Sequence, residues 1–272
     1  MEYVSLGHME RAPLVYSLAM IEFAPVPGMD DFAEDIMEAL RSTYPDISEF
    51  NTPNLTVQVD ANSGETKAEQ RMLTQWRLNN ADGNFGIVFG KERLVFHTTI
   101  YKSFALFAES MRPVIQTVFD IANIKYVKNI GIRHIDNIFP MEGKAIKDLL
   151  KPGYLCPEQG ESLVPEFSRV EFVYKSKIGY LYLRSYELRD HPRVPQDLFP
   201  AASQLSQDYK LMEPIKENFV LLDTDHIYTP EKLQEANIDK IIDTLDELHK
   251  QNSLGFRSMV EENAIELWRN GA

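Results

Sequence analysis

The segment RMLTQWRLNNADGNFGIVFGKERLVFHTTIY, residues Arg71–Tyr101, decides the fold of this chain. Alternating apolar residues over Arg71–Asn79 indicate a strand with one buried face. Apolar runs at Phe85–Phe89 and Leu94–Tyr101 have the length of two further strands. Asp82-Gly83 after the first strand, and a glycine-containing turn after the second, are typical of short connections between antiparallel strands. The segment therefore predicts a three-stranded antiparallel meander.

Two amphipathic helices are predicted, one on each side of this meander in the sequence. The first carries an apolar stripe at four-residue spacing: Phe32, Ile36, Leu40 and Tyr44. The second carries a wider stripe with two aromatic residues: Phe104, Phe107, Met111, Val114 and Val118. Pro113 falls inside the second stripe, which predicts either a kink there or a helix that starts near Ser110.

The first half of the chain reads as one α+β unit. Strands are also predicted at Val15–Phe23, Leu55–Asp60 and Tyr126–Phe139, so residues 1–140 have the order β-α-β-β-β-β-α-β. A single antiparallel sheet covered by helices on one face satisfies that order. Residues 140–167, which follow, are rich in proline and glycine and predict an irregular boundary.

The second half, residues 141–272, has a similar series of elements. A hairpin is predicted from Arg169–Lys175 and Tyr180–Leu188, followed by a strand at Phe219–Asp225 and then by amphipathic helices. We therefore predict an α+β protein with two similar lobes, 1–140 and 141–272, each an antiparallel sheet packed against amphipathic helices. The alternative that stays open is one continuous domain in which both lobes share a sheet.

The helices of the second half have recognisable start signals. Thr229-Pro230 combines a capping hydroxyl with proline at the first helical position, which predicts a helix start there. Ser253 is placed to cap a final helix over Phe256–Trp268.

The charge of the chain limits its partners. The sequence has 28 Lys and Arg against 41 Asp and Glu, a net charge of −13, and its basic residues do not cluster. Binding to a phosphate backbone needs several clustered cations, so no nucleic acid partner is expected. No segment approaches the roughly 20 apolar residues of a membrane helix, and no signal peptide is recognisable. A single cysteine, Cys156, points to a reducing compartment, and the cytoplasm is the predicted location.

The sequence lacks the motifs of standard nucleotide-dependent enzymes. It has no phosphate-binding glycine loop, no dinucleotide fingerprint, no nucleophile elbow, and no zinc-binding pattern of paired cysteines or of histidines on a helix. No cofactor is therefore expected.

The most polar predicted strand is Gly131–Ile138, with the sequence GIRHIDNI. Two-residue periodicity places His134 and Asp136 on one face, and Arg133 and Asn137 on the other. An imidazole beside a carboxylate could act as a general base with its orienting group. The favoured interpretation is a satisfied polar pair in a half-buried sheet, because buried polar groups need partners in any protein.

A second polar group lies at the end of the predicted strand that reaches Asp225. Asp223 and Asp225 share a face, and either carboxylate could bind Arg133 in bidentate geometry. Together with His226 they are weak candidates for a divalent metal site, which a further ligand would have to complete. Turn and cap residues are the favoured interpretation, so no metal is expected.

Several segments occur in an order that resembles a known family. They are Ala12–Val15, Tyr44-Pro45, Tyr101 with Phe104 and Phe107, Gly131–Ile135, Leu222–Asp225, Leu248-His249 and Phe256. The chain resembles a sporadically distributed bacterial family of conserved proteins of unknown function and of roughly this length. Asp136 departs from the pattern, since the family usually has asparagine there. The resemblance implies no activity or cofactor, and its sporadic distribution is typical of accessory genes.

These observations lead to one main functional hypothesis and two alternatives. We expect a non-enzymatic cytoplasmic binding protein that engages a protein partner, of an antitoxin, immunity or defence-accessory type. The first alternative is a metal-dependent hydrolase that acts on a small molecule or nucleotide. The second is a ligand-holding cleft lined by aromatic residues: Phe104, Phe107, Tyr180 and Tyr182. The oligomeric state is open, with a homodimer among the alternatives.

Overall fold

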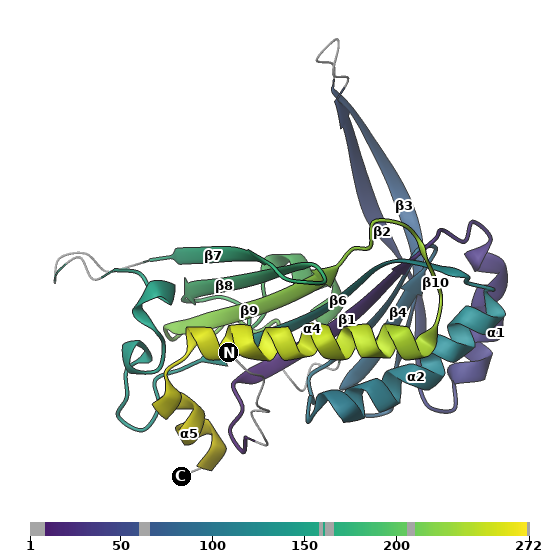
Figure 1. Cartoon of the computed structure of the whole chain (residues 1–272). Coiled ribbons are helices and arrows are strands. Elements are labelled where there is room, and N and C mark those ends of the chain that lie inside the picture. The colour runs from purple at the N-terminus through teal and green to yellow at the C-terminus, as the bar shows by residue number, and fades with distance from the viewer. Residues whose placement is uncertain (1–8, 60–65, 158–159, 161–165, 206–209, 271–272) are drawn as a thin grey trace.

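The computed structural model describes residues 9–59, 66–157, 160, 166–205 and 210–270 (Figure 1). Its strands form one ten-stranded sheet in the order β2-β3-β4-β5-β1-β6-β9-β8-β7, and β10 also pairs with β6. All pairings are antiparallel. The strands are β1 Leu14–Phe23, β2 Asp46–Val59, β3 Thr66–Asn79, β4 Phe85–Gly90, β5 Arg93–Thr98, β6 Tyr126–Ile138, β7 Ser168–Lys175, β8 Tyr180–Leu188, β9 Phe219–Tyr228 and β10 Gln234–Glu235.

The helices of the described residues cover mainly one face of this sheet. The α-helices are α1 Met29–Leu40, α2 Phe104–Ile121, α3 Phe199–Ala202, α4 Ile238–Met259 and α5 Glu262–Asn270. Short 3-10 turns are η1 Ile146–Asp148, η2 Pro152–Tyr154 and η3 Gln196–Leu198. The meander predicted from Arg71–Tyr101 is confirmed as β3, β4 and β5, and the predicted hairpin as β7 and β8.

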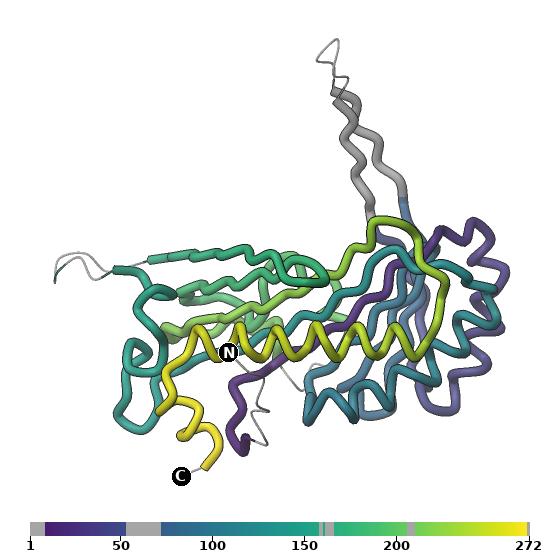
Figure 2. Tube along the Cα trace, in the orientation of Figure 1, coloured from purple at the N-terminus to yellow at the C-terminus, as the bar shows by residue number. Residues whose placement is uncertain are grey.

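The prediction of two lobes is wrong. Strand β6 from the first half pairs with β9 from the second half, from Ile130 opposite Tyr228 to Ile138 opposite Val220. Helix α4 then lies along the sheet over β9 and β6 and also contacts α2, as the trace in Figure 2 shows. The α+β class is confirmed, with one continuous sheet. Strand β6 is paired at both edges, with β1 of the first half and with β9 of the second, so its backbone N–H and C=O groups find partners in both halves.

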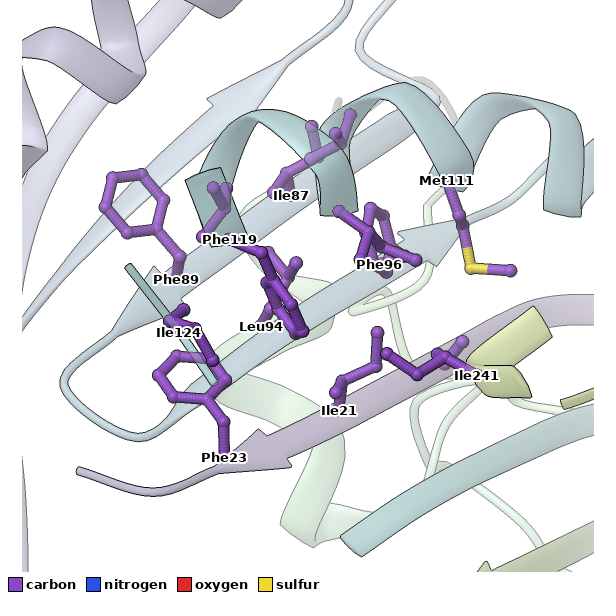
Figure 3. Packing of buried hydrophobic residues seen from close by; sticks show 14 of the residues in the cluster. Ile21, Phe23, Ile87, Phe89, Leu94, Phe96, Met111, Phe119, Ile124 and Ile241 are labelled. Atoms are coloured by element: carbon purple, nitrogen blue, oxygen red, sulfur yellow. The ribbon is translucent and has the colours of Figure 1, made fainter. Parts of the chain in front are cut away.

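The main core lies between the sheet and α1, α2 and α4. Figure 3 shows Ile21 and Phe23 of β1 packed with Phe96 of β5, Met111 of α2 and Ile241 of α4, from both halves of the chain. A second cluster continues on this face under the end of α4 and α5. A third cluster lies on the opposite face, beneath the irregular segment that contains η3 and α3.

Helix α2 starts at Phe104, where the hydroxyl of Ser103 accepts a hydrogen bond from the backbone N–H of Leu106. The predicted alternative start near Ser110 is therefore wrong, and Pro113 lies within the helix. A proline inside a helix costs about 3 kcal/mol. Burial of the apolar stripe offsets this, since each large side chain contributes about 1.5–3 kcal/mol.

Two predicted helix boundaries in the second half are also wrong. Helix α4 is capped by Asn237, whose side chain accepts from the backbone N–H of Lys240, and not by Thr229. The chain is still extended at Gln234–Glu235, because β10 pairs with β6. Ser253 lies inside α4 and caps nothing, because the buried stripe continues through it to Met259.

Candidate functional site

Strand β6 presents polar side chains to both faces of the sheet. His134 and Asp136 face the helices, where His134 approaches His249 of α4. Arg133 and Asn137 face the other side, where both bind the segment around η3. The predicted alternation is confirmed. The four candidate residues therefore belong to two separate environments.

The helix-facing environment is a pocket of about 610 Å³ between β6, the start of α2 and the middle of α4, which we call the β6–α4 pocket. Sites for small molecules have volumes of roughly 300–1,000 Å³. The sheet contributes polar groups from His134, Asp136 and Thr224. The other lining side chains are mostly apolar, among them Leu14, Pro13, Phe104 and Phe256, with charged groups from Lys102, Asp246 and Lys250.

Two histidines from β6 and α4 meet in this pocket. Nε2 of His134 lies 3.4 Å from Nδ1 of His249, and the two rings are edge-to-face. The hydroxyl of Ser17 lies 2.8 Å from Nδ1 of His134, and the hydroxyl of Tyr101 lies 3.3 Å from Nδ1 of His249. Phe104 stacks on His249 with ring centroids 5.2 Å apart. These contacts fix both rings. They use only Nδ1 of His249, so its Nε2 is available to a ligand, as a donor in one tautomer of this histidine and as an acceptor in the other.

Both histidines are neutral at physiological pH. Burial and, to a smaller extent, the neighbouring His249 lower the pKa of His134 to about 3. Burial likewise lowers the pKa of His249 to about 4, against the opposing effect of Asp246. In each case the low-dielectric surroundings disfavour the charged imidazolium. The pair therefore offers hydrogen bonds to a ligand without a formal charge.

Asp136 is the least satisfied polar group of the pocket. Its exposed fraction is only 5%, it lines the pocket, and no described residue forms a hydrogen bond with its carboxyl group. Burial and, to a smaller extent, the carboxylate of Asp223 raise the pKa of Asp136 to about 8. The group is therefore mostly protonated at neutral pH, with one O–H donor and one carbonyl acceptor.

The arrangement does not support His134 as a general base oriented by Asp136. Ser17 on β1, and not Asp136, forms the hydrogen bond with Nδ1 of His134. A general base works best with a pKa close to the working pH, and the pKa of His134 is far below it. The two residues share a pocket but do not form a catalytic pair.

The opposite face of β6 and β9 holds a buried charge network. Nε and Nη2 of Arg133 each donate a 2.8 Å hydrogen bond to Asp223, as the sequence predicted for one of the two aspartates. Arg184 of β8 also binds Asp223, at 3.1 Å, and lies 3.5 Å from Asp225. Burial raises the pKa of Asp225 to about 6, although Arg133 opposes the shift. A second pocket of about 640 Å³ borders this network.

The three weak metal candidates do not converge. Asp223 and Asp225 face the arginines, whereas His226 faces α4. Nδ1 of His226 lies 3.3 Å from the carbonyl of Leu248, and its Nε2 lies 2.9 Å from the hydroxyl of Ser176. Strand β9 runs on through His226 and does not end before it, so the strand alternation separates the three groups. The part of the chain that the structure describes has no group of three or more side chains arranged to hold a metal ion.

Some residues of the β6–α4 pocket are not identifiable from the sequence as members of one site. Tyr101 and Asn252 line the pocket, and Ser17 contacts His134, but the three residues lie far apart in the sequence. The sequence suggests a position for His249 near a helix end, but α4 continues to Met259, so His249 lies in its middle. One signal was present: His249 and Asn252 interrupt an otherwise apolar stripe of α4.

The predicted aromatic cleft is divided between several environments. Phe104 lines the β6–α4 pocket, whereas Phe107 belongs to the main core. Tyr182 lies beneath the guanidinium of Arg184, and Tyr180 is largely exposed. These four side chains do not form one cleft.

The chain matches no protein-family model and no curated protein with which it was compared. Among the described residues, no helix has the length and apolar character that crossing a membrane requires.

Proposed function

We propose that this protein binds a small, uncharged organic molecule in the β6–α4 pocket and holds it by the carboxyl group of Asp136. One observation carries the proposal: a buried carboxyl group lines a pocket of about 610 Å³ and has no hydrogen bond within the described chain. A polar group that a ligand shuts off from water without a partner costs about 1–3 kcal/mol. A ligand that supplies hydrogen bonds to the carboxyl group avoids that cost.

The chemistry of the pocket favours an amide or lactam. A protonated carboxyl group has one donor and one acceptor side by side, which matches the C=O and N–H of an uncharged amide. Nε2 of His249 is available for a third hydrogen bond. Phe104, Phe256 and Leu14 offer apolar contact to the rest of such a molecule. Beside Asp136 and the two histidines a charged headgroup is disfavoured, because it would lose its hydration against groups that are neutral there.

Binding is favoured over acid–base catalysis by the pKa values of the pocket. The two imidazoles, with pKa values of about 3 and about 4, are weak bases at neutral pH. The hydrolase alternative also loses support, because its proposed ligands Asp223, Asp225 and His226 lie on two faces of the sheet. The proposal retains the binding function expected from the sequence and changes the kind of ligand. An antitoxin, immunity or defence-accessory partner remains a separate prediction, and a pull-down from the native host tests it.

Saturation-transfer NMR and thermal shift with benzamide and its charged analogue benzoate test the proposal. Benzamide should bind and raise the melting temperature, and benzoate should bind at least about tenfold more weakly. Asp136→Leu should abolish the benzamide signal, because the substitution removes the donor and acceptor. Asp243→Leu is the matched control, since Asp243 is an exposed acid of α4 outside the pocket. Equal benzamide binding by both variants, or by neither variant nor the wild type, would contradict the proposal.

A further inference from the structure

We infer that β7 is a dimerisation strand, which pairs antiparallel with β7 of a second copy and joins two sheets into one. Strand β7 is the last strand at one end of the sheet, and only β8 pairs with it among the described residues (Figure 1). Such an edge strand offers a row of unpaired backbone N–H and C=O groups. This inference is independent of the β6–α4 pocket.

Strand β7 exposes three large apolar side chains in succession. Val173 has an exposed fraction of 53%, and Phe172 and Tyr174 are also largely exposed. Proteins usually protect edge strands with charged side chains, prolines, bulges or short length. Of these devices β7 has charged side chains, at Arg169, Glu171 and Lys175. Strand β7 has eight residues, no proline, and an uninterrupted register with β8. Its exposed apolar surface therefore fits an occupant that adds a further strand.

The sequence of β7 is complementary to itself in one register. A two-fold axis at Val173 places Phe172 opposite Tyr174 of the second copy, and Glu171 opposite Lys175. Phe172 and Tyr174 lie on one face of the strand, since they pair with Leu183 and Leu181 of the core. Glu171 and Lys175 alternate with them on the other face. Cross-strand aromatic and opposite-charge pairs each contribute about 0.2–1 kcal/mol, and the two-fold axis repeats every pair.

A second copy explains this surface better than an unlimited assembly. Pairing of β7 with the other sheet edge, β2, would be head-to-tail and would continue into filaments. Pairing of β7 with itself uses the same surface on both copies and closes at two. The opposite charges of Glu171 and Lys175 favour this register. If the two-fold axis moved from Val173 to Phe172, the register would shift by two residues and bring Arg169 opposite Lys175.

The inference is tested by sedimentation equilibrium of the full chain. Concentrations up to about 100 µM detect dimers with dissociation constants of that order. The wild type should sediment as a dimer. Val173→Lys and Val173→Glu should each be monomeric, with dissociation constants raised by about tenfold or more, because each puts like charges on the two-fold axis. An equimolar mixture of the two variants should restore the dimer, since Lys then faces Glu.

Leu106→Lys is the matched control, because Leu106 is equally exposed but lies on α2. It should leave the dimer unchanged. Circular dichroism of all variants establishes that each is folded. A monomeric wild type would overturn the inference. The edge of β7 would then be available to pair with a strand of a different protein. A dimer that survives Val173→Lys, or a mixture that stays monomeric, would also overturn it.

Discussion

Arg133 and Asp223 form a bidentate pair between neighbouring strands, with two hydrogen bonds of 2.8 Å. The side chain of Asp223 is 0% exposed and also accepts a hydrogen bond from Arg184 on β8. One carboxylate therefore links β6, β9 and β8 on the face opposite the β6–α4 pocket. Because β6 and β9 join the two halves of the chain, this pair is expected to contribute directly to the stability of the whole sheet.

We predict that Asp223→Asn lowers the free energy of unfolding by up to about 3–5 kcal/mol, since it removes the buried carboxylate that two guanidinium groups share. Arg133 then keeps the exposed Asp197, and Arg184 keeps Glu171 and Asp225. Urea unfolding followed by circular dichroism measures the change. Asp197→Asn is the matched control, because Asp197 binds the same Arg133 but its side chain is 62% exposed. That substitution should cost about 1 kcal/mol or less. Equal losses for both variants would contradict a special role for the buried pair.

The protonated carboxyl of Asp136 predicts a distinct dependence of stability on pH. Its pKa is raised to about 8 in the folded state, whereas an unfolded aspartate has a pKa of about 3.9. The folded chain therefore binds more protons between these values, and the free energy of unfolding falls as pH rises toward 8. Above pH 7 Asp225, whose pKa is about 6, contributes no further change. The buried histidines, whose pKa values are lowered, contribute a smaller change of the opposite sign, because the unfolded chain loses its last histidine protons there.

Between pH 7 and pH 8 the unfolding free energy of the wild type should fall by about 1 kcal/mol relative to that of Asp136→Asn, close to the limit of about 1.4 kcal/mol per pH unit for one group. Asp136→Asn should lose almost none, because an amide does not titrate. Denaturant unfolding at both pH values measures this difference. If the variant kept the slope of the wild type, another group would be responsible.

Gly86 occupies a position without room for a side chain. A Cβ atom there would lie 2.3 Å from Nε2 of His97 and 2.6 Å from Oδ1 of Asn79. The ring of His97 is fully buried, and its Nδ1 lies 2.8 Å from the hydroxyl of Tyr16, so it cannot turn aside freely. Gly86→Ala should therefore lower the unfolding free energy by about 1–3 kcal/mol.

Thermal and urea unfolding measure the effect of Gly86→Ala. The matched control is Gly153→Ala in η2, where an added Cβ meets nothing within 4 Å. This control should be neutral, or stabilising by up to about 1 kcal/mol, because alanine restricts the unfolded chain. A Gly86→Ala protein as stable as the control would show that His97 and Asn79 can move apart without penalty.

The start of α4 gives a direct test of the two possible caps. The side chain of Asn237 accepts a 2.9 Å hydrogen bond from the backbone N–H of Lys240. Asn237→Ala should cost about 1 kcal/mol, the usual effect of removing a helix cap. Thr229→Ala, at the start predicted from the sequence, should cost less than about 0.5 kcal/mol, as surface substitutions do. The reverse order in the melting temperatures would favour a helix start at Thr229.

The candidate site was only partly predictable. His134 and Asp136 could be assigned to one face of a strand, and Arg133 to an aspartate on the other face, because side-chain alternation is a local property. The partners of His134 could not be assigned, since Ser17 and His249 lie 117 and 115 positions away in the sequence. Nor could periodicity show that Asp136 lacks a hydrogen-bond partner, because that depends on every element around the pocket.

The sequence by itself determined the class of the fold, the antiparallel meander β3–β5, the hairpin β7–β8 and the two polar faces of β6. Each follows from a pattern of apolar, polar and turn residues within one or two elements. Only the tertiary structure decided that β6 and β9 unite both halves in one sheet and that α4 runs without a break across it. The reason is that strand pairing and helix ends are settled by burial over long sequence separations, which outweighs local signals such as Thr229 and Ser253.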